Sequence, residues 1–242
     1  MAFNILYDTL TNPGERAINE DYLDVAVAKD CVSFILCDGL GGHGNGDVAS
    51  EFVTEHVKDR LEQGSSLEDS IMGAQEALLE KQILENAGNT MKTTVTCLSV
   101  GEESARFGYV GDSRIYYFEK AKYKLRSLDH SIPQMLVNRG DIREKDIRHH
   151  EDRSRLLRVM GTEWNGPKYQ MSEEIPLTKN SSFLLCSDGF WELIDEKNMS
   201  KTLKKAATPK DWLSAMEKII WDNGRGTNMD NFSAIAVFVR EK

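Results

Sequence analysis

The spacing of apolar positions along the chain alternates between the periods of strands and of helices. Short apolar or alternating runs predict β-strands at 3–7, 22–28, 32–37, 93–100, 106–110, 114–118, 124–128, 168–175, 182–187 and 232–239. Apolar residues that recur at helical spacing predict helices over about 46–63, 67–87 and 209–222. Thr208 followed by Pro209 is a typical start for the third of these helices.

The order of these elements points to a fold class. The strands come in consecutive runs, and the helices fall between them in pairs. Regular alternation of strand and helix would favour a parallel sheet, and the pattern does not show it. It predicts an α+β fold of antiparallel sheets with helices on the outside. Because the chain has 242 residues, we expect residues 1–242 to form one large domain.

Charge and cysteine content argue against several classes of function. The formal net charge of −9 disfavours nucleic acid and anionic membranes as partners. The four cysteines form no Cys-x-x-Cys pair and lie in or beside apolar runs, which is typical of buried free thiols in a reducing compartment. The first residues lack a signal-peptide pattern, and no apolar run is long enough to span a membrane. We therefore expect a cytoplasmic protein.

Candidate chemistry lies at the ends of the predicted strands. Asp38 and Asp188 follow apolar runs. Asp112 lies between two strands, and Asp230 precedes the last strand. Each acid alone has an ordinary explanation, because Asp beside Gly or Asn is common in turns. If the four acids converge in the folded chain, they would build an all-oxygen site suited to Mg²⁺ or Mn²⁺.

The glycine-rich stretch after Asp38 allows a second interpretation. Residues 39–44 fit the spacing G-x-G-x-x-G between a strand and a helix, which is a dinucleotide-binding fingerprint. No βαβ series follows, and Asp38 would repel a pyrophosphate. We interpret the glycines as residues that allow positive φ values and bring backbone carbonyls close to a cation. Residues 149–152 are two histidines followed by two acids, which could suggest a metal site. Adjacent side chains point in different directions, so we interpret this run as a charged loop.

Six short motifs follow one another along the chain. They are Arg16-x-x-x-Glu20-Asp21, Asp38-Gly39-Leu40-Gly41-Gly42-His43, Gly111-Asp112-Ser113-Arg114, Leu128-Asp129-His130-Ser131, Ser187-Asp188-Gly189 and Asp230-Asn231-Phe232-Ser233. Each motif alone is weak, but the ordered set resembles the metal-dependent Ser/Thr protein phosphatases of the type 2C (PPM) family in their compact bacterial form. The resemblance implies a four-layer α-β-β-α sandwich, with two antiparallel sheets packed face to face and flanked by helix pairs.

The resemblance also implies a set of metal ligands. Asp38 would bridge two Mg²⁺ or Mn²⁺ ions, and the backbone carbonyl of Gly39 would bind one of them. Asp188 and Asp230 would bind the other ion. Asp112, together with Asp188, would hold a third ion, as in bacterial relatives.

The remaining candidates would act around the ions. Glu20 and Asp21 would hold metal-bound waters, and Arg16 would bind the substrate phosphate. Many relatives carry a histidine, proposed as the general acid, where this chain has Leu40. His43 follows three residues later, so its role is open between loop packing and proton transfer. Asn231 is a further candidate.

The implied activity is hydrolysis of phosphoserine and phosphothreonine in proteins. The ions would lower the pKa of a bridging water, which would attack the phosphorus in line. We expect a monomer that reverses a cognate Ser/Thr kinase, with about 131–160 as a flap that contacts protein substrates. Open alternatives are a phosphatase-like binding module without turnover, a partner-switching phosphoserine antagonist, and hydrolysis of a small phosphorylated metabolite.

Overall fold

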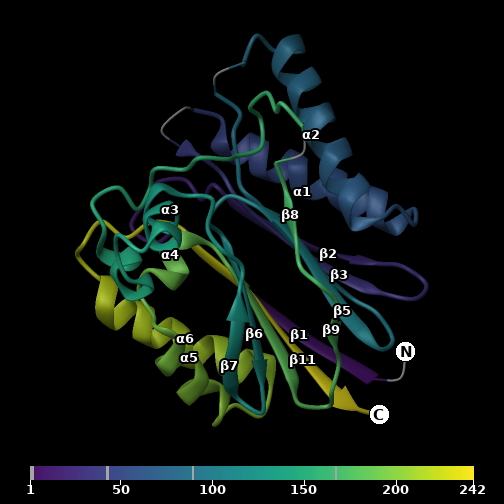
Figure 1. Cartoon of the computed structure of the whole chain (residues 1–242), viewed down its shortest axis with the longest axis vertical. Coiled ribbons are helices and arrows are strands. Elements are labelled where there is room, and N and C mark those ends of the chain that lie inside the picture. Colours follow the sequence, from purple (N-terminus) through teal and green to yellow (C-terminus); the bar gives the residue numbers. More distant parts are fainter. Residues whose placement is uncertain (1–2, 42–43, 89, 167) are drawn as a thin grey trace.

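The computed structural model describes residues 3–41, 44–88, 90–166 and 168–242. Its strands are β1 (Phe3–Asn12), β2 (Asp21–Val27), β3 (Val32–Asp38), β4 (Val95–Val100), β5 (Ser104–Val110), β6 (Arg114–Glu119), β7 (Lys122–Arg126), β8 (Gln170–Met171), β9 (Ile175–Pro176), β10 (Ser181–Cys186) and β11 (Phe232–Glu241). The first sheet has the order β1-β11-β10-β6-β7, and the second has the order β2-β3-β4-β5-β8, with β9 also paired to β5. Both sheets are antiparallel and pack face to face (Figure 1).

Helices cover the outer faces of the two sheets. The described helices are α1 (Gly46–Glu62), α2 (Leu67–Leu84), α3 (Ile132–Arg139), the 3-10 helix η2 (Glu144–His149), α4 (Asp188–Trp191), α5 (Glu196–Leu203) and α6 (Pro209–Gly224). α1 and α2 cover the second sheet, and α5 and α6 cover the first (Figure 1). Among the described residues, no helix has the length and apolar character needed to cross a lipid bilayer.

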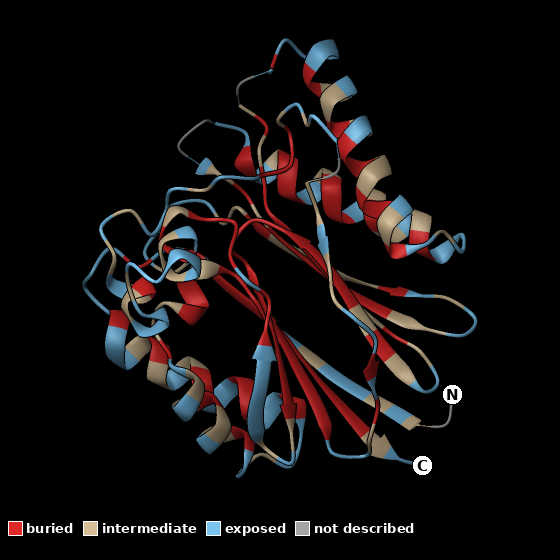
Figure 2. Ribbon diagram, viewed as in Figure 1, coloured by how far each residue is buried: buried red, intermediate tan, exposed pale blue. Residues whose placement is uncertain are grey.

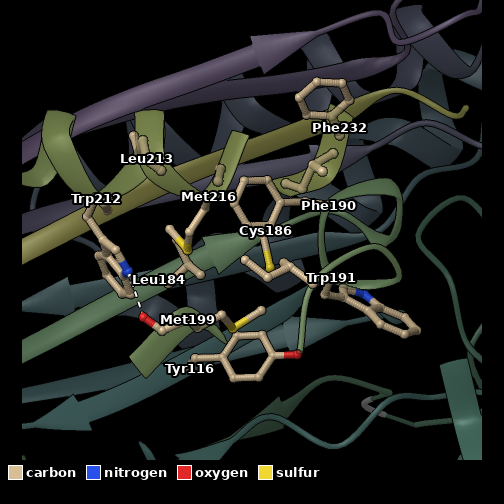
Figure 3. Packing of buried hydrophobic residues seen from close by; sticks show 14 of the residues in the cluster. Tyr116, Leu184, Cys186, Phe190, Trp191, Met199, Trp212, Leu213, Met216 and Phe232 are labelled. Atoms are coloured by element: carbon tan, nitrogen blue, oxygen red, sulfur yellow. Dashed lines mark hydrogen bonds between the residues drawn. The ribbon is translucent and has the colours of Figure 1, made fainter. Parts of the chain in front are cut away.

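The central strands are buried on both faces. On β10, Phe183 and Leu185 pack between the two sheets. Leu184 and Cys186 of the same strand pack against the helices of the first sheet (Figure 3). Because successive side chains point to opposite faces of a strand, such strands read as continuous apolar runs. Buried positions accordingly concentrate in the central strands of both sheets (Figure 2).

The predicted four-layer α+β sandwich is confirmed, and the differences concern element boundaries and short elements. β1 continues past its predicted end at Tyr7 because all 10 of its residues pair with β11. The strand expected at 168–175 is instead two strands of 2 residues each. α2 ends at Leu84, before the predicted residue 87. α5 was not predicted, because it buries only Met199 and Leu203 and so shows little helical period.

Leu185→Ala should lower the free energy of unfolding by about 2–5 kcal/mol, because truncation of this fully buried side chain leaves a cavity between the sheets. Leu84→Ala is the matched control, since Leu84 is 83% exposed at the end of α2. Its effect should stay within about 0.5 kcal/mol. Urea denaturation measures the free energy of unfolding of both variants. An equal loss of stability in the two would contradict the packing described.

Candidate active site

The acids at the strand ends lie at one rim of the sandwich. Asp38 is the last residue of β3, and Asp188 is the first residue of α4. Asp112 lies in the turn between β5 and β6, and Asp230 lies just before β11. All four line one cleft of about 660 Å³. The same cleft is lined by the other predicted residues Arg16, Glu20, Gly39 and Asn231.

The pairing of β2 with β3 brings another acid, Asp21, next to Asp38. Asp21 is buried and is the cross-strand partner of Asp38. Its Oδ2 accepts a hydrogen bond of 2.7 Å from the hydroxyl of Ser187, which ties the second sheet to the first at this rim. Its Oδ1 has no hydrogen-bond partner among the described residues. A buried carboxylate oxygen without a partner suits a water or a cation.

Burial and like charges raise the pKa values of these acids. Burial, and then the charge of Asp188, raise the pKa of Asp38 well above its usual range. Burial, and then the charge of Asp112, do the same to the pKa of Asp188. Burial raises the pKa of Asp21 and that of Asp112 to about 7. A divalent cation would favour the charged forms of all four groups.

The donor set of the cleft fits Mg²⁺ or Mn²⁺. The candidate side-chain ligands Asp38, Asp112, Asp188 and Asp230 offer carboxylate oxygens, which are hard ligands. In the described parts of the chain, no three His, Cys, Asp or Glu side chains already form a closed metal cage. An open arrangement is compatible with Mg²⁺, because this ion keeps several of its waters when it binds to proteins.

The glycines after Asp38 make room for Glu20. A Cβ at Gly41 would lie 1.9 Å from the Glu20 carboxylate, and one at Gly39 would lie 2.2 Å from the carbonyl oxygen of Gly46. Among the described glycines of this loop, only Gly44 has a positive φ, at 76°. The expected positive φ is therefore wrong for Gly39 and Gly41. Close packing, and not backbone conformation, requires glycine at these two positions.

Arg16 lies at the same cleft and faces Asp230. Its Nε and Nη2 each lie 3.2 Å from an oxygen of the Asp230 carboxylate. Gly14 allows the two loops to approach, because it has a φ of 61° and a Cβ there would lie 2.2 Å from the Asp230 carbonyl oxygen. Both side chains are about half exposed. A guanidinium fork in this place can bind two oxygens of a phosphate.

Asn231 fixes the loop that carries Arg16. Its Nδ2 donates hydrogen bonds to the carbonyl oxygens of Pro13, at 3.0 Å, and Ile18, at 2.9 Å. Its Oδ1 accepts a hydrogen bond of 2.8 Å from the N–H of Glu20. The sequence singled out Asn231 without this role. The contacts assign it to positioning, since every polar atom of the side chain is already bonded to backbone.

The 131–160 segment places two side chains in the cleft, Ser154 and Leu156, that sequence reasoning did not identify. Arg153 of the same segment lies 2.9 Å from the carboxylate of Glu192, directly after α4. Nothing in the local sequence marks these positions, because a charged loop has no period and its partners lie far along the chain.

A buried ion network anchors this segment. Arg114 donates two hydrogen bonds, of 2.8 and 2.6 Å, to Asp129, and both side chains are almost fully buried. Arg126 donates to the same Asp129 at 3.2 Å and also to Gln134 and Glu144, at 2.8 and 2.9 Å. These contacts fasten the segment to β6 and β7. Asp129 therefore fixes the two arginines that hold the segment.

The histidine predictions have different outcomes. The Nδ1 of His150 accepts a hydrogen bond of 3.1 Å from the N–H of Asp152, which is a loop contact. Within the described residues, the run at 149–152 makes no metal cluster. His43 lies outside the described residues, so its role stays a prediction.

A four-layer sandwich with carboxylates gathered at one rim beside an arginine has the form of a metal-dependent phosphatase. The family profile described as "Protein phosphatase 2C" matches residues 14–219. The chain therefore belongs to the protein phosphatase 2C family, and the resemblance drawn from the motifs is confirmed.

Known relatives agree with this assignment. The serine/threonine phosphatase stp of Listeria monocytogenes serotype 4b is 30% identical over 204 residues, which cover 80% of each chain. The crystal structure of the serine/threonine phosphatase Stp1 from Staphylococcus aureus matches with a TM-score of 0.87 and 28% identity, over 96% of this chain and 94% of that one. The catalytic domain of PstP, solved in complex with two manganese ions, has the same fold, with a TM-score of 0.80 and 21% identity over 98% and 99% of the two chains.

His130 supports the turn that carries Asp112. Its Nδ1 accepts a hydrogen bond of 3.2 Å from the N–H of Gly111, and its ring stacks on Tyr109 with centroids 5.0 Å apart. Burial, and then the charge of Arg158, lower the pKa of His130 to about 4, while Asp129 acts in the opposite direction. Because the folded protein keeps His130 neutral, the contribution of His130 to the free energy of unfolding is fully present above its unfolded pKa, near 6.5. That stabilisation is lost as the pH falls from there through 4.

Between pH 7 and pH 4.5, the wild-type protein should lose about 2–3 kcal/mol more stability than His130→Asn, because Asn keeps an acceptor but does not titrate. Urea unfolding at a series of pH values gives the comparison. Two parallel pH profiles would show that His130 does not take up a proton in this range on unfolding.

Proposed function

We propose that the protein hydrolyses phosphoserine and phosphothreonine in proteins with the help of divalent cations. The observation that carries this proposal is the convergence of Asp38, Asp188 and Asp230 on one cleft that also contains Arg16. A phosphomonoester dianion resists attack by an anion, and cations held by these carboxylates reduce that repulsion. Membership of the protein phosphatase 2C family supports the same activity.

The proposed cofactors are Mg²⁺ or Mn²⁺, two ions with a third at Asp112. Asp38 would bridge the first two, with the Gly39 carbonyl on one ion and both Asp188 and Asp230 on the other. When bound, the ions would supply a water of lowered pKa and neutralise charge on the phosphoryl oxygens. The two manganese ions in the PstP catalytic domain support this choice of metal.

The other residues of the cleft would bind substrate and water. Arg16 would bind two phosphate oxygens through its planar fork of donors. Glu20, whose carboxylate is closely surrounded by the glycine loop, would hold a water. Asp21 would hold a second water through Oδ1, since the hydroxyl of Ser187 already occupies Oδ2.

The proposed substrates are phosphoproteins made by a cognate Ser/Thr kinase of the same cell. We propose that residues 1–242 act as one monomeric domain in the cytoplasm, a compartment that the four free thiols favour. Protein substrates would also contact the 131–160 segment. Two side chains of that segment, Ser154 and Leu156, line the cleft, so a bound protein would meet the segment next to its phosphorylated residue.

Removal of a residue that only orients a metal ligand lowers activity by roughly 10- to 100-fold. Asp38→Asn should lower the rate of Mn²⁺-dependent hydrolysis of an aryl phosphate by more than that. Asp222→Asn, at an exposed position of α6, is the matched control and should keep the wild-type rate. A chelator should abolish the wild-type activity, and added Mn²⁺ should restore it. A wild-type protein that binds Mn²⁺ yet releases no phosphate from aryl phosphate or phosphopeptide would instead be a binding module.

Arg139→Gln and Arg155→Gln should each raise KM for an acidic phosphopeptide by roughly 1.5- to 5-fold, because exposed charge pairs contribute little individually. Both side chains are about two-thirds exposed on the 131–160 segment. KM for the aryl phosphate should not change. Arg106→Gln, at the opposite end of β5 from Asp112, is the control. An equal loss on both substrates would exclude a role for the segment in substrate contact.

A further inference from the structure

Trp191 joins the two chain segments that carry Asp112 and Asp188. It is the last residue of α4, and Asp188 is the first. The indole Nε1–H of Trp191 donates a hydrogen bond of 3.0 Å to the backbone carbonyl oxygen of Asp112. Trp191 is fully buried, so this bond does not compete with water. One side chain therefore spans the distance between the helix of one acid and the turn of the other.

Two arginines hold the indole ring in this position. The guanidinium carbon of Arg114 lies 3.4 Å from the ring centroid of Trp191, and that of Arg148 lies 5.6 Å from it. Arg114 is itself fixed by its two hydrogen bonds to Asp129. Cation–π contacts of this kind are strongest where the groups are desolvated, as they are here for Arg114.

Arg148 links the same tryptophan to the 131–160 segment. It belongs to η2, and its Nη1 donates to the backbone carbonyl oxygen of Trp191. Its Nη2 donates to Glu196 at the start of α5, at 2.6 Å. A displacement of η2 would therefore pull on α4, and through the indole on the turn that carries Asp112.

We propose that Trp191 is a positioning residue, which sets the spacing between the Asp112 and Asp188 carboxylates and couples that spacing to the 131–160 segment. The inference rests on the proposed function, because it treats the two acids as ligands of one cation. Contact of a protein substrate with the segment would then change the affinity for that cation.

Trp212 provides a matched control for a purely structural role. It is as deeply buried as Trp191, in the same hydrophobic cluster. Its Nε1–H donates a hydrogen bond of 3.0 Å to the carbonyl oxygen of Met199 (Figure 3). The substitution Trp→Phe removes one buried indole N–H donor at either position, and the donor of Trp212 is shared with the hydroxyl of Thr202, at 3.2 Å. Only at Trp191 does the bond end on a candidate metal-binding residue.

The test compares Trp191→Phe with Trp212→Phe by calorimetric titration with Mn²⁺, next to thermal unfolding without metal. We expect the weakest class of Mn²⁺ sites to lose affinity by roughly 10- to 100-fold in Trp191→Phe, as for other residues that orient ligands, and to be unchanged in Trp212→Phe. Equal Mn²⁺ affinities in the two variants would overturn the inference and leave the proposed function standing. A wild-type protein that bound no Mn²⁺ would overturn both.

Arg148→Gln tests the link to the 131–160 segment without a substitution of Trp191 itself. Hydrogen exchange of peptides from this segment is measured with and without Mn²⁺. In the wild-type protein, Mn²⁺ should slow exchange in the segment, and in Arg148→Gln this effect should disappear while Mn²⁺ still binds. The coupling would be overturned if Mn²⁺ did not change the exchange rate of the segment in the wild-type protein. It would also be overturned if Mn²⁺ slowed exchange equally in Arg148→Gln.

Discussion

Negative charge held close together in a partly buried cleft is the constraint on which the rest of this structure depends. Burial and neighbouring carboxylates raise the pKa values of Asp38 and Asp188. Without a cation, the charged forms of these side chains are therefore disfavoured. The protein keeps such groups together by fixing their backbone. The N–H of Asp38 donates to the Thr94 hydroxyl at 3.0 Å, and its carbonyl accepts from the Thr94 N–H at 2.8 Å. Sheet pairing thus offsets a repulsion that a free loop would relieve by moving.

Contacts between distant parts of the sequence complete the rim. The Glu15 carboxylate accepts hydrogen bonds from the N–H groups of Gly226, at 2.7 Å, and Met229, at 3.1 Å. It therefore fastens the loop of Arg16 to the loop of Asp230, next to the bonds that Asn231 makes. The pairing of β1 with β11 along its whole length brings these two loops to the same end of the sheet. Arg16, proposed to bind phosphate, and Asp230, proposed to bind a metal ion, are in this way held by one frame.

The sequence was informative wherever a local pattern has one physical cause. Central strands buried on both faces gave continuous apolar runs, and the acids at their ends marked the rim. The register of β1 and the short helix α5 were less visible, because pairing and tertiary burial decide them. Gly41 was identified for the wrong reason, since its neighbour Glu20 is remote in sequence. Trp191 and the bonding of Asn231 were invisible, because each depends on a partner that only the folded chain supplies.

Anomalous diffraction from crystals grown with Mn²⁺ tests the central claim most directly. The account predicts manganese peaks within roughly 2.0–2.6 Å of carboxylate oxygens of Asp38, Asp188 and Asp230, the distances usual for hard cations on oxygen ligands. It also predicts that the Oδ1 of Asp21, which has no partner among the described residues, faces a water bound to one of these ions. Manganese peaks elsewhere on the surface, with these carboxylates empty, would contradict it.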